Sequence, residues 1–372
     1  MLDHTRMAAD PLDWMSRHGV DAPVHFRAEA VLVAQAKAFV RGFGGMVTYA
    51  VKANPDEAVL RALAAGGVTG FDVASPEEIA LVRRLFPRAA LHYNNPVRSP
   101  AEIAAGLAAG VASWSVDEAG ELEKLARLAP GTEVAVRFKL PVAGAAYNFG
   151  EKFGATPDEA IGLLARVAAR GLTPALTFHV GTQCTDPSAW ASYVTEAARI
   201  AAVAGVTIAR LNVGGGFPSA RGGVAIDLKP YFTAIHAALS AFPICPALVC
   251  EPGRALVADA FAHAVPVKAL RPGRAYLADG IYGALSEAPS MGVPRFSVHA
   301  PGGAARQGAA RPTAVFGPTC DSLDRLPGLV PLPVDTAPGD VMLFRGMGAY
   351  VTGVSTRFNG YGDWRTVSVA SL

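Results

Sequence analysis

Residues 46–55 read Met46-Val47-Thr48-Tyr49-Ala50-Val51-Lys52-Ala53-Asn54-Pro55 and open the alternation of strands and helices that decides the fold. The apolar run predicts a short strand, which Asn54-Pro55 ends because proline cannot donate to a strand ladder. That strand therefore ends at a lysine amine. A strand-end lysine is usually a solvated surface charge, so Lys52 becomes a functional candidate only if the chain supplies partners for it.

Apolar strands and amphipathic helices continue to alternate from this stretch to about residue 250. The later predicted strands span residues 70–75, 90–94, 113–116, 133–138, 176–180, 211–213 and 247–250. The predicted helices span residues 26–40, 56–65, 100–109, 117–128, 157–169, 187–204 and 228–241, with another capped by Ser75-Pro76. About eight such units in roughly 230 residues predict parallel strands closed into a (β/α)8 TIM-type barrel, with a doubly wound open sheet as the alternative.

The character of the sequence changes after about residue 258, where Gly, Pro and short β-type runs dominate and no helical period persists. Predicted strands span residues 275–278, 313–316 and 341–344, and residues 301–308 form a predicted exposed loop. The fold class is therefore α/β, with a barrel at residues 24–258 and a C-terminal all-β domain. Residues 1–23, a short helix and an extended lead-in, are assigned to that β domain together with residues 259–372.

Composition and charge exclude several classes of partner. The chain of 372 residues is 51% hydrophobic and 17% charged, against about 25% charged in an average soluble domain, which favours large buried surfaces. A formal net charge of +2 without a basic tract argues against nucleic acid or an anionic membrane surface. No apolar run reaches the roughly 18 residues of a membrane-spanning helix, and residues 1–6 lack a signal-peptide core, so a cytoplasmic protein is expected. None of the four cysteines has metal-site spacing, so no metal is predicted.

Polar side chains with chemical uses stand at the carboxyl ends of the predicted strands, where barrel enzymes carry their active sites. These positions hold Lys52, Asp72, Arg137, His179, Gly181-Thr182, Gly214-Gly215-Gly216 and Glu251-Pro252-Gly253-Arg254. Consecutive glycines let backbone N–H groups approach a phosphate, Thr182 offers a hydroxyl, and Arg254 offers a fork of donors. A glycine run alone is often only a turn and a histidine often a core residue, so the prediction rests on the whole set.

Pyridoxal phosphate needs these groups together: a lysine for a Schiff base, a cup for the phosphate, and an acid that keeps the pyridine nitrogen protonated. Lys52 fits the first role and Glu251 the last, while His179 could stack on the ring. The chain is therefore predicted to bind pyridoxal 5'-phosphate.

Six motifs, in order through about residues 45 to 360, resemble the ornithine/diaminopimelate/arginine decarboxylases, pyridoxal-phosphate enzymes with the alanine-racemase fold. They are Ala50-Val51-Lys52-Ala53-Asn54, Phe71-Asp72-Val73-Ala74-Ser75, His179-Val180-Gly181-Thr182, Gly214-Gly215-Gly216-Phe217-Pro218, Glu251-Pro252-Gly253-Arg254 and Gly317-Pro318-Thr319-Cys320-Asp321-Ser322-Leu323-Asp324. Cys320-Asp321 and Ala278-Asp279-Gly280-Ile281-Tyr282-Gly283 are most similar to the ornithine decarboxylases of that family.

The resemblance implies a role for each residue. Lys52 would bind the cofactor covalently, His179 would stack on its ring and Glu251 would pair with its ring nitrogen. The phosphate would be held by Thr182, Gly214, Gly215, Gly216, Arg254 and Tyr350, and Asp72 and Arg137 would lie around the lysine and the cofactor. Tyr350 belongs to the β domain, so that domain is expected to complete the active site.

The resemblance also implies the reaction: decarboxylation of a basic L-amino acid, with L-ornithine giving putrescine and CO2 in polyamine biosynthesis. Cys320 would supply a proton across the interface of a homodimer with shared active sites; a buried structural cysteine is the alternative. Asp321, Asp279 and Tyr282 would bind the substrate, since carboxylates suit a terminal ammonium and repel a terminal carboxylate. Lys152 and Asp324 match a salt-bridge pair between subunits in the family.

Other functions stay open from the sequence. Lysine differs from ornithine by one methylene, worth about 1–3 kcal/mol in a pocket, so a lysine or dual-specificity decarboxylase is an alternative, as is diaminopimelate decarboxylase. Thr182-Gln183 and residues 285–291 depart from the usual ornithine decarboxylase pattern. An amino-acid racemase would leave Cys320-Asp321 unexplained. A catalytically inactive, regulator-binding homologue would usually lack the lysine or the cysteine.

Overall fold

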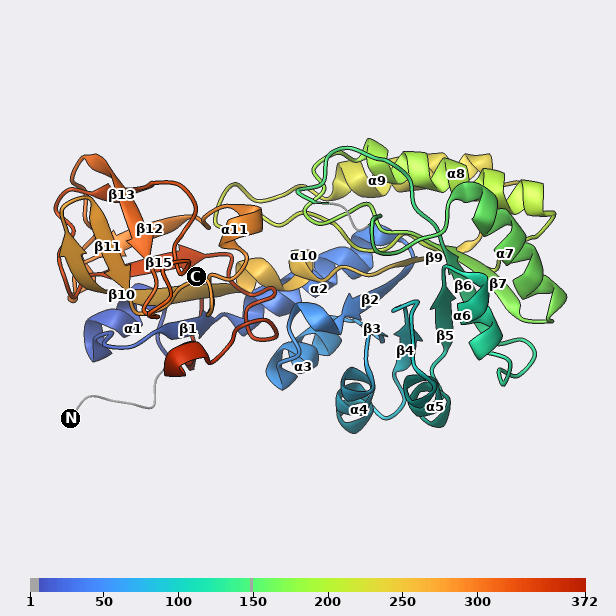
Figure 1. The fold of residues 1–372 in the computed structure, drawn as a ribbon, viewed down its shortest axis with the longest axis horizontal. Coiled ribbons are helices and arrows are strands. Elements are labelled where there is room, and N and C mark those ends of the chain that lie inside the picture. Colours follow the sequence, from blue (N-terminus) through green and yellow to red (C-terminus); the bar gives the residue numbers. More distant parts are fainter. Residues whose placement is uncertain (1–6, 148–149) are drawn as a thin grey trace. The chain divides into compact units, whose positions relative to one another are not determined.

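The structure is a computed structural model that describes residues 7–147 and 150–372. The start of the predicted lead-in, residues 1–6, lies outside the described residues. The chain forms two compact units. One contains Gln35–Pro218 and Ile226–Ala255; the other contains the residues up to Ala34 together with Ser219–Ala225 and Leu256–Leu372. Figure 1 shows the first unit as a barrel of strands with helices outside it and the second as a mainly β domain.

The first unit is a closed barrel of parallel strands, β2 to β9 in chain order. The strands are β2 (Met46–Ala50), β3 (Gly70–Val73), β4 (Ala90–Tyr93), β5 (Ser113–Val116), β6 (Glu133–Arg137), β7 (Thr173–Thr177), β8 (Arg210–Asn212) and β9 (Ala247–Cys250). The ring closes where β2 pairs with β9, Val47 lying opposite Cys250. This closure confirms the predicted (β/α)8 barrel and excludes the open sheet.

Helices connect successive barrel strands. They are α3 (Glu57–Ala65), α4 (Pro76–Leu85), α5 (Pro100–Ala108), α6 (Ala119–Lys124), α7 (Pro157–Ala169), α8 (Ser188–Ala204) and α9 (Lys229–Ala238), and α2 (Glu29–Phe43) precedes β2. Their starts follow from local sequence: Ser99 and Thr156 form capping boxes with the glutamate three residues on, and a proline follows each cap. These two helices, α5 and α7, therefore begin where side chains satisfy the first backbone N–H groups.

The second unit is built on an eight-stranded sheet. Its central path runs β12 (Phe296–His299), β15 (Val341–Arg345), β10 (Phe261–Arg271), β11 (Arg274–Leu277), β13 (Ala310–Phe316) and β14 (Val330–Pro333), while β1 (Val24–Arg27) pairs with β10 and β16 (Arg365–Ser368). Two short helices, α1 (Pro11–His18) and α11 (Ala288–Met291), also belong to this unit. We refer to it as the sheet domain.

The structure corrects one predicted boundary. Residues 24–27 were assigned to the barrel, but they form β1, antiparallel to β10 and parallel to β16 in the sheet domain. Phe26 is fully buried against sheet-domain residues such as Ala262 and Leu343. The local pattern could not reveal this pairing because β10 lies more than 230 positions further along the chain.

Two other elements differ from their predicted ranges. The strand expected at residues 176–180 is β7, Thr173–Thr177, so His179 lies in the loop beyond the strand. The helix expected at residues 117–128 is the shorter α6, Ala119–Lys124. Both differences move polar residues onto loops at the carboxyl end of the barrel, where side chains have more freedom to meet.

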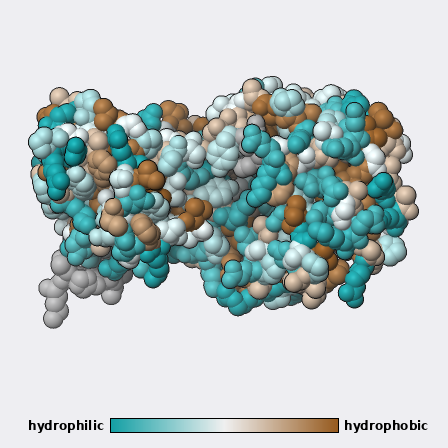
Figure 2. All heavy atoms as spheres, viewed as in Figure 1, coloured by the Kyte–Doolittle hydropathy of each residue, from teal (hydrophilic) through white to brown (hydrophobic). Residues whose placement is uncertain are grey.

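Hydrophobic side chains exposed on the surface are scattered. Figure 2 shows them as small patches among hydrophilic residues on the face it draws. In the part of the chain that the structure describes, no helix combines the length and hydrophobicity needed to cross a membrane.

Candidate active site

A cavity of about 210 Å³ lies at the carboxyl ends of the barrel strands. It is lined by Lys52, Asp72, Ala74, Asn94, Asn95, Arg137, Lys152, Phe153, Thr177, Phe178, His179 and Glu251. Five of these were predicted from the sequence as site residues: Lys52, Asp72, Arg137, His179 and Glu251. They come from different strands, and the closed barrel brings them together because parallel strands end at the same rim.

Lys52 follows β2 directly, in a single 3-10 turn at Val51–Ala53. Its ammonium is close enough to Asp72, at the end of β3, to oppose the rise in that group's pKa. Burial is the larger effect and raises the pKa of Asp72 above its usual value. Lys52 thus has a buried acid as its neighbour, so it is not the isolated surface charge that its position alone would suggest.

Glu251 follows β9 and is held by two side-chain amides. Asn94 and Asn212 each donate from Nδ2 to Oε1 of Glu251. Burial and then the charge of Asp72 raise the pKa of Glu251 to about 8. An acid with this pKa can hold or release a proton near neutral pH, as the partner of a basic ring nitrogen must.

His179 is fixed by its own loop. The backbone N–H of Gly181 donates to Nδ1 of His179 at 3.0 Å. Burial, then Arg137 and Lys52, lowers the pKa of His179 well below its usual value. The ring is therefore neutral near pH 7, and with Nδ1 accepting, its proton is on Nε2. A neutral imidazole in a cavity wall suits contact with an aromatic ring.

Arg137 is the last residue of β6 and stands over the ring of Phe153, with its guanidinium carbon 5.2 Å from the ring centroid. Burial lowers the pKa of Arg137, while the nearby acids Glu251, Asp117 and Asp72 oppose that shift. The cavity is therefore lined by three basic side chains, Lys52, Arg137 and Lys152, and two buried acids, Asp72 and Glu251.

The predicted triple glycine follows β8 and has no room for side chains. A Cβ on Gly214 would collide with the carbonyl oxygen of Phe178, and one on Gly216 with that of Gly181. A Cβ on Gly215 would lie 2.7 Å from the carbonyl oxygen of Glu251 and 3.1 Å from Nε2 of His179. Gly214 and Gly216 also have φ values of +66° and +91°, which favour glycine. The run therefore forms a tight backbone cradle beside His179 and Glu251.

The other two barrel residues assigned to the phosphate, Thr182 and Arg254, are both buried. Thr182 is buried, and its backbone pairs with Tyr147 across the preceding loop. It follows Gly181, whose carbonyl approaches Gly216. Arg254 is buried at the first position of the short helix α10 (Arg254–Val257), three residues after Glu251.

The chain matches two family descriptions. Residues 29–258 match "Pyridoxal-dependent decarboxylase, pyridoxal binding domain", and residues 247–348 match "Pyridoxal-dependent decarboxylase, C-terminal sheet domain". The first match alone covers more than half of the chain. The protein belongs to the pyridoxal-dependent decarboxylase family.

Individual relatives of this decarboxylase agree with that membership. Ornithine decarboxylase from Mus musculus is 33% identical over 345 residues, covering 84% of this chain and 73% of the relative. Lysine/ornithine decarboxylase from Selenomonas ruminantium is 31% identical over 329 residues, covering 85% and 81%. A crystal structure of lysine/ornithine decarboxylase from Vibrio vulnificus complexed with cadaverine superposes with a TM-score of 0.83 at 28% identity, covering 94% of this chain and 95% of that one.

The residues of the decarboxylase cavity fit pyridoxal phosphate. The triple-glycine run carries no side chains that would cover its backbone N–H groups, and such uncovered backbone is what close approach to a phosphate requires. Oε1 of Glu251 is taken by two amides, and no described residue donates to Oε2, which is left for a ring nitrogen. Lys52 lines the same cavity. Cradle, acid and lysine thus occur together in one unit of the chain.

Three further predicted residues of the decarboxylase meet in the sheet domain. The hydroxyl of Tyr282 donates to Oδ2 of Asp321 at 2.5 Å, and this bond holds the pKa of Asp321 below its usual value. Cys320, next to it, is exposed and bonds through its backbone N–H and Sγ to Oδ1 of Asn359, at 3.1 and 3.2 Å. The ring of Phe358 packs 5.1 Å from that of Tyr282. We call Tyr282, Cys320, Asp321 and Asn359 the acid-thiol cluster.

The geometry of Asp279 does not fit the predicted contact with substrate. Asp279 is 1% exposed. Its Oδ1 accepts from the N–H of Gly280 at 2.8 Å, and its Oδ2 accepts from the N–H of Ala284 at 3.1 Å and from Nε2 of His263 at 2.9 Å. The carboxylate therefore fixes the turn that carries Tyr282, and we do not retain it as a substrate ligand.

Asp324 and Tyr350 also have defined local settings in the sheet domain. The carboxylate of Asp324 accepts from the N–H groups of Ile281 and Thr319 and from the hydroxyl of Thr319. It is 1% exposed, so within its own chain it braces two loops. Tyr350 follows β15 and has a φ of +57°, a conformation that is costly for tyrosine and common at functional sites.

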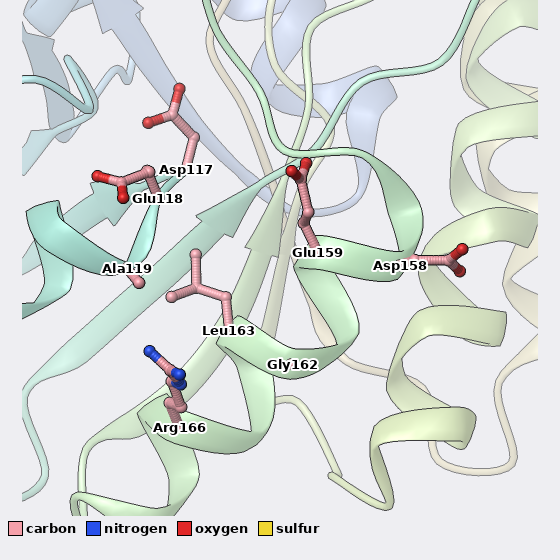
Figure 3. Close-up of a pocket in the computed structure, with 8 residues that line it drawn as sticks. All are labelled: Asp117, Glu118, Ala119, Asp158, Glu159, Gly162, Leu163 and Arg166. Atoms are coloured by element: carbon pink, nitrogen blue, oxygen red, sulfur yellow. The ribbon is translucent and has the colours of Figure 1, made fainter.

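A second hollow, of about 310 Å³, lies between the start of α6 and α7 (Figure 3). Its lining residues are Asp117, Glu118, Ala119, Asp158, Glu159, Gly162, Leu163 and Arg166. Asp117 accepts a hydrogen bond from the N–H of Gly154, and Glu159 accepts one from the N–H of Thr156, the N-cap residue of α7. Asp158 points away from the other carboxylates in Figure 3. Asp117 and Glu159 thus serve local structure, and we assign no function to this hollow.

Sequence reasoning missed three asparagines: Asn94, Asn212 and Asn359. The first two bind the buried acid of the barrel, and the third binds the exposed thiol of the sheet domain. The only signal available for Asn94 and Asn212 was their place at or just beyond a strand's carboxyl end, within otherwise apolar runs. Asn359 offered no signal, because it lies in an irregular loop.

Proposed function

We propose that the protein is a homodimeric L-ornithine decarboxylase that releases CO2 and putrescine, and thereby serves polyamine biosynthesis in the cytoplasm. The observation that carries the proposal is the barrel cavity, where Lys52, His179 and Glu251 surround a backbone cradle made by three glycines. Family membership supplies the reaction class. The acid-thiol cluster supports the choice of a basic substrate.

When bound, pyridoxal phosphate accepts the electrons left behind as the bond between Cα and the carboxylate breaks and CO2 departs. Lys52 provides the amine to which the cofactor attaches and which the substrate amine replaces. Glu251 holds a proton at the ring nitrogen through Oε2. His179, neutral and fixed by Gly181, covers one face of the ring and excludes water from it.

Cys320 donates the proton that replaces CO2 at Cα. Its thiol is exposed, and Asn359 holds it in one orientation through Oδ1. A thiol with a fixed partner can deliver a proton to one face of the reacting carbon, which sets both the rate and the position of protonation. By resemblance to the family, the thiol acts in the active site of the partner subunit.

Asp321 receives the terminal ammonium of ornithine. The hydroxyl of Tyr282 keeps the pKa of Asp321 low, so the group is a carboxylate at neutral pH. That charge attracts an ammonium and repels a second carboxylate, which disfavours diaminopimelate. Asp279 takes no part in this recognition, because it is 1% exposed within its own chain and its carboxylate holds the turn that carries Tyr282.

Lysine is the second candidate substrate. The relatives from Selenomonas ruminantium and Vibrio vulnificus are both named lysine/ornithine decarboxylases, and the latter was solved with cadaverine. The two substrates differ by one methylene, which changes affinity by about 1–3 kcal/mol.

The compartment and the assembly follow from the same proposal. All four cysteines are free, including the exposed Cys245 and Cys320, which suits a reducing compartment such as the cytoplasm. Exposure of Cys320 and Asp321 on the sheet domain suits residues that meet a partner subunit.

Addition of pyridoxal phosphate to the purified protein tests the proposal. We expect a visible absorption band from the lysine-bound cofactor and putrescine from L-ornithine, with both lost in Lys52→Ala. A wild-type protein that takes up the cofactor but yields no putrescine would refute the assigned substrate. A protein that never acquires the band would refute the assigned cofactor site.

A further inference from the structure

Asn94 lies beside the two buried acids of the cavity and bonds directly to Glu251. It lies directly after β4 and is 9% exposed. Its Nδ2 donates to Oε1 of Glu251. Asn94 also lies close enough to Asp72 to oppose the rise in the pKa of that carboxyl.

The donor count explains why an asparagine suits this position. A side-chain amide has two N–H bonds, so Nδ2 can serve one acid with each. Oε1 of Glu251 is completed by Nδ2 of Asn212, whose Oδ1 accepts from the N–H of Gly214 at 3.0 Å. Because Oε1 accepts two hydrogen bonds, these bonds oppose rotation of the carboxylate. Oε2 is therefore the oxygen left for a ligand.

Behind Asn94, the buried guanidinium of Arg98 holds the backbone on both sides. Its NH1 donates to the carbonyl oxygens of Tyr93 at 3.2 Å and Asn95 at 2.6 Å, the residues that flank Asn94. Its NH2 donates to the carbonyl oxygen of Ser115, beyond β4 on the neighbouring strand, at 2.6 Å. Arg98 thereby ties the end of β4 to β5 in one conformation.

The guanidinium of Arg98 bonds to backbone carbonyls rather than to a carboxylate. It is 1% exposed, and in the described part of the chain no carboxylate forms an ion pair with its guanidinium. The rings of Tyr93 and Trp114 each lie with their centroids 5.3 Å from its guanidinium carbon. Burial of a cation is costly unless other groups offset it. Here three backbone carbonyls and two aromatic rings stabilise the buried guanidinium of Arg98.

We propose that Asn94, held in place by Arg98, is a positioning residue that turns the carboxylate of Glu251 so that Oε2 meets the ring nitrogen of the cofactor. This inference rests on the proposed function for the identity of that ring. Lys52 and Arg137 also act on both acids, but through their charge, whereas Asn94 and Asn212 bond directly to Oε1 of Glu251.

The test compares Asn94→Ala with wild type in two states. In the cofactor-free protein, the titration of the Glu251 carboxyl is followed by carbon-13 NMR with labelled glutamate. Loss of a donor to the carboxylate destabilises its anion, so the pKa of Glu251 should rise. In the reconstituted protein, the dissociation constant of pyridoxal phosphate should increase about tenfold, since a hydrogen bond to a charged group is lost. The kcat for ornithine should fall while its KM changes little.

Three further variants separate positioning from simple stability. Asn94→Ser keeps one donor and should give a smaller shift of the same sign, and it serves if Asn94→Ala does not fold. Arg98→Lys keeps the charge but cannot span both flanking carbonyls, and should shift the Glu251 titration in the same direction. Asn95→Ala is the matched control for that titration, because the Asn95 side chain bonds to Ala74 and Val97 rather than to an acid.

An unchanged titration of Glu251 in Asn94→Ala would overturn the proposal, whatever the activity. A lower melting temperature in Arg98→Lys with an unchanged titration would overturn the role of Arg98. Failure of the wild-type protein to decarboxylate ornithine, with the titration shift present, would instead overturn the proposed function and leave the positioning of Glu251 supported.

Discussion

Asp279→Asn should weaken the fold and leave substrate affinity nearly unchanged, the opposite of what a substrate ligand would do. The carboxylate accepts three hydrogen bonds at a site that is 1% exposed: from Gly280, Ala284 and His263. Asparagine has the same shape but replaces one acceptor oxygen by an NH2 group. Whichever way the amide turns, at least one buried N–H then faces another N–H.

The size of the effect follows from those partners. One or two buried donors lose their acceptor, at about 1–3 kcal/mol each, so the free energy of unfolding should fall by roughly 1 to 6 kcal/mol. This corresponds to a melting temperature lower by roughly 2 to 24 °C in a domain of this size. Tyr282 lies on the turn that Asp279 holds, so kcat should fall as the assay temperature approaches the lowered melting temperature.

Thermal unfolding and ornithine kinetics, both on the reconstituted enzyme, make the comparison, with Asp321→Asn as the matched control. Asp321 is partly exposed, so its variant should melt close to wild type. Its KM for ornithine should rise roughly ten- to hundredfold, since a charge-assisted bond to the substrate is lost. A stable Asp279→Asn with a raised KM would refute the structural role of Asp279 and restore it as a substrate ligand.

Three other outcomes are expected. Cys320→Ala should still release CO2 but protonate Cα slowly or at the wrong atom, measured as the ratio of putrescine to CO2; an unchanged ratio and rate would remove Cys320 from the mechanism. Gly215→Ala should weaken pyridoxal phosphate binding at least tenfold, because its Cβ would press on Glu251 and His179, whereas Gly162→Ala, with open space around its Cβ, should bind normally and melt slightly higher. In the cofactor-free protein, Glu251 has a folded-state pKa of about 8, above its usual value of 4.5. Its contribution to stability is therefore fully present below about pH 4.5 and is lost as the pH rises through about 8. Glu251→Gln should flatten this fall of the melting temperature with pH, and an equally steep fall would refute the raised pKa.

The barrel and its charged rim were predictable from local pattern. The strands are short, largely apolar runs, and several helices, such as α4, α5 and α7, begin at a Ser or Thr cap followed by proline. Because parallel strands share a carboxyl end, Lys52, Asp72, Arg137 and Glu251 could be assigned to one site without knowledge of their distances. Their convergence on one cavity is a consequence of closure, which length and repeat number already indicated.

The features that escaped prediction depend on contacts between residues far apart in the chain. Asn94 and Glu251 are 157 positions apart, and nothing near either residue indicates the other. Asp279 resembled a substrate ligand in its motif, yet it is 1% exposed and accepts hydrogen bonds from His263 on β10 and from the turn it begins. The strand at Val24–Arg27 pairs with β10 and β16, and its short apolar run would fit a barrel equally well.

The most direct test of the account is CO2 release from ornithine, lysine, arginine and diaminopimelate by the purified, reconstituted enzyme. The acid-thiol cluster and the barrel cavity predict the highest kcat/KM for L-ornithine, with lysine lower by roughly ten- to hundredfold and diaminopimelate essentially inert. Release of CO2 from neither ornithine nor lysine, or a clear preference for diaminopimelate, would contradict it.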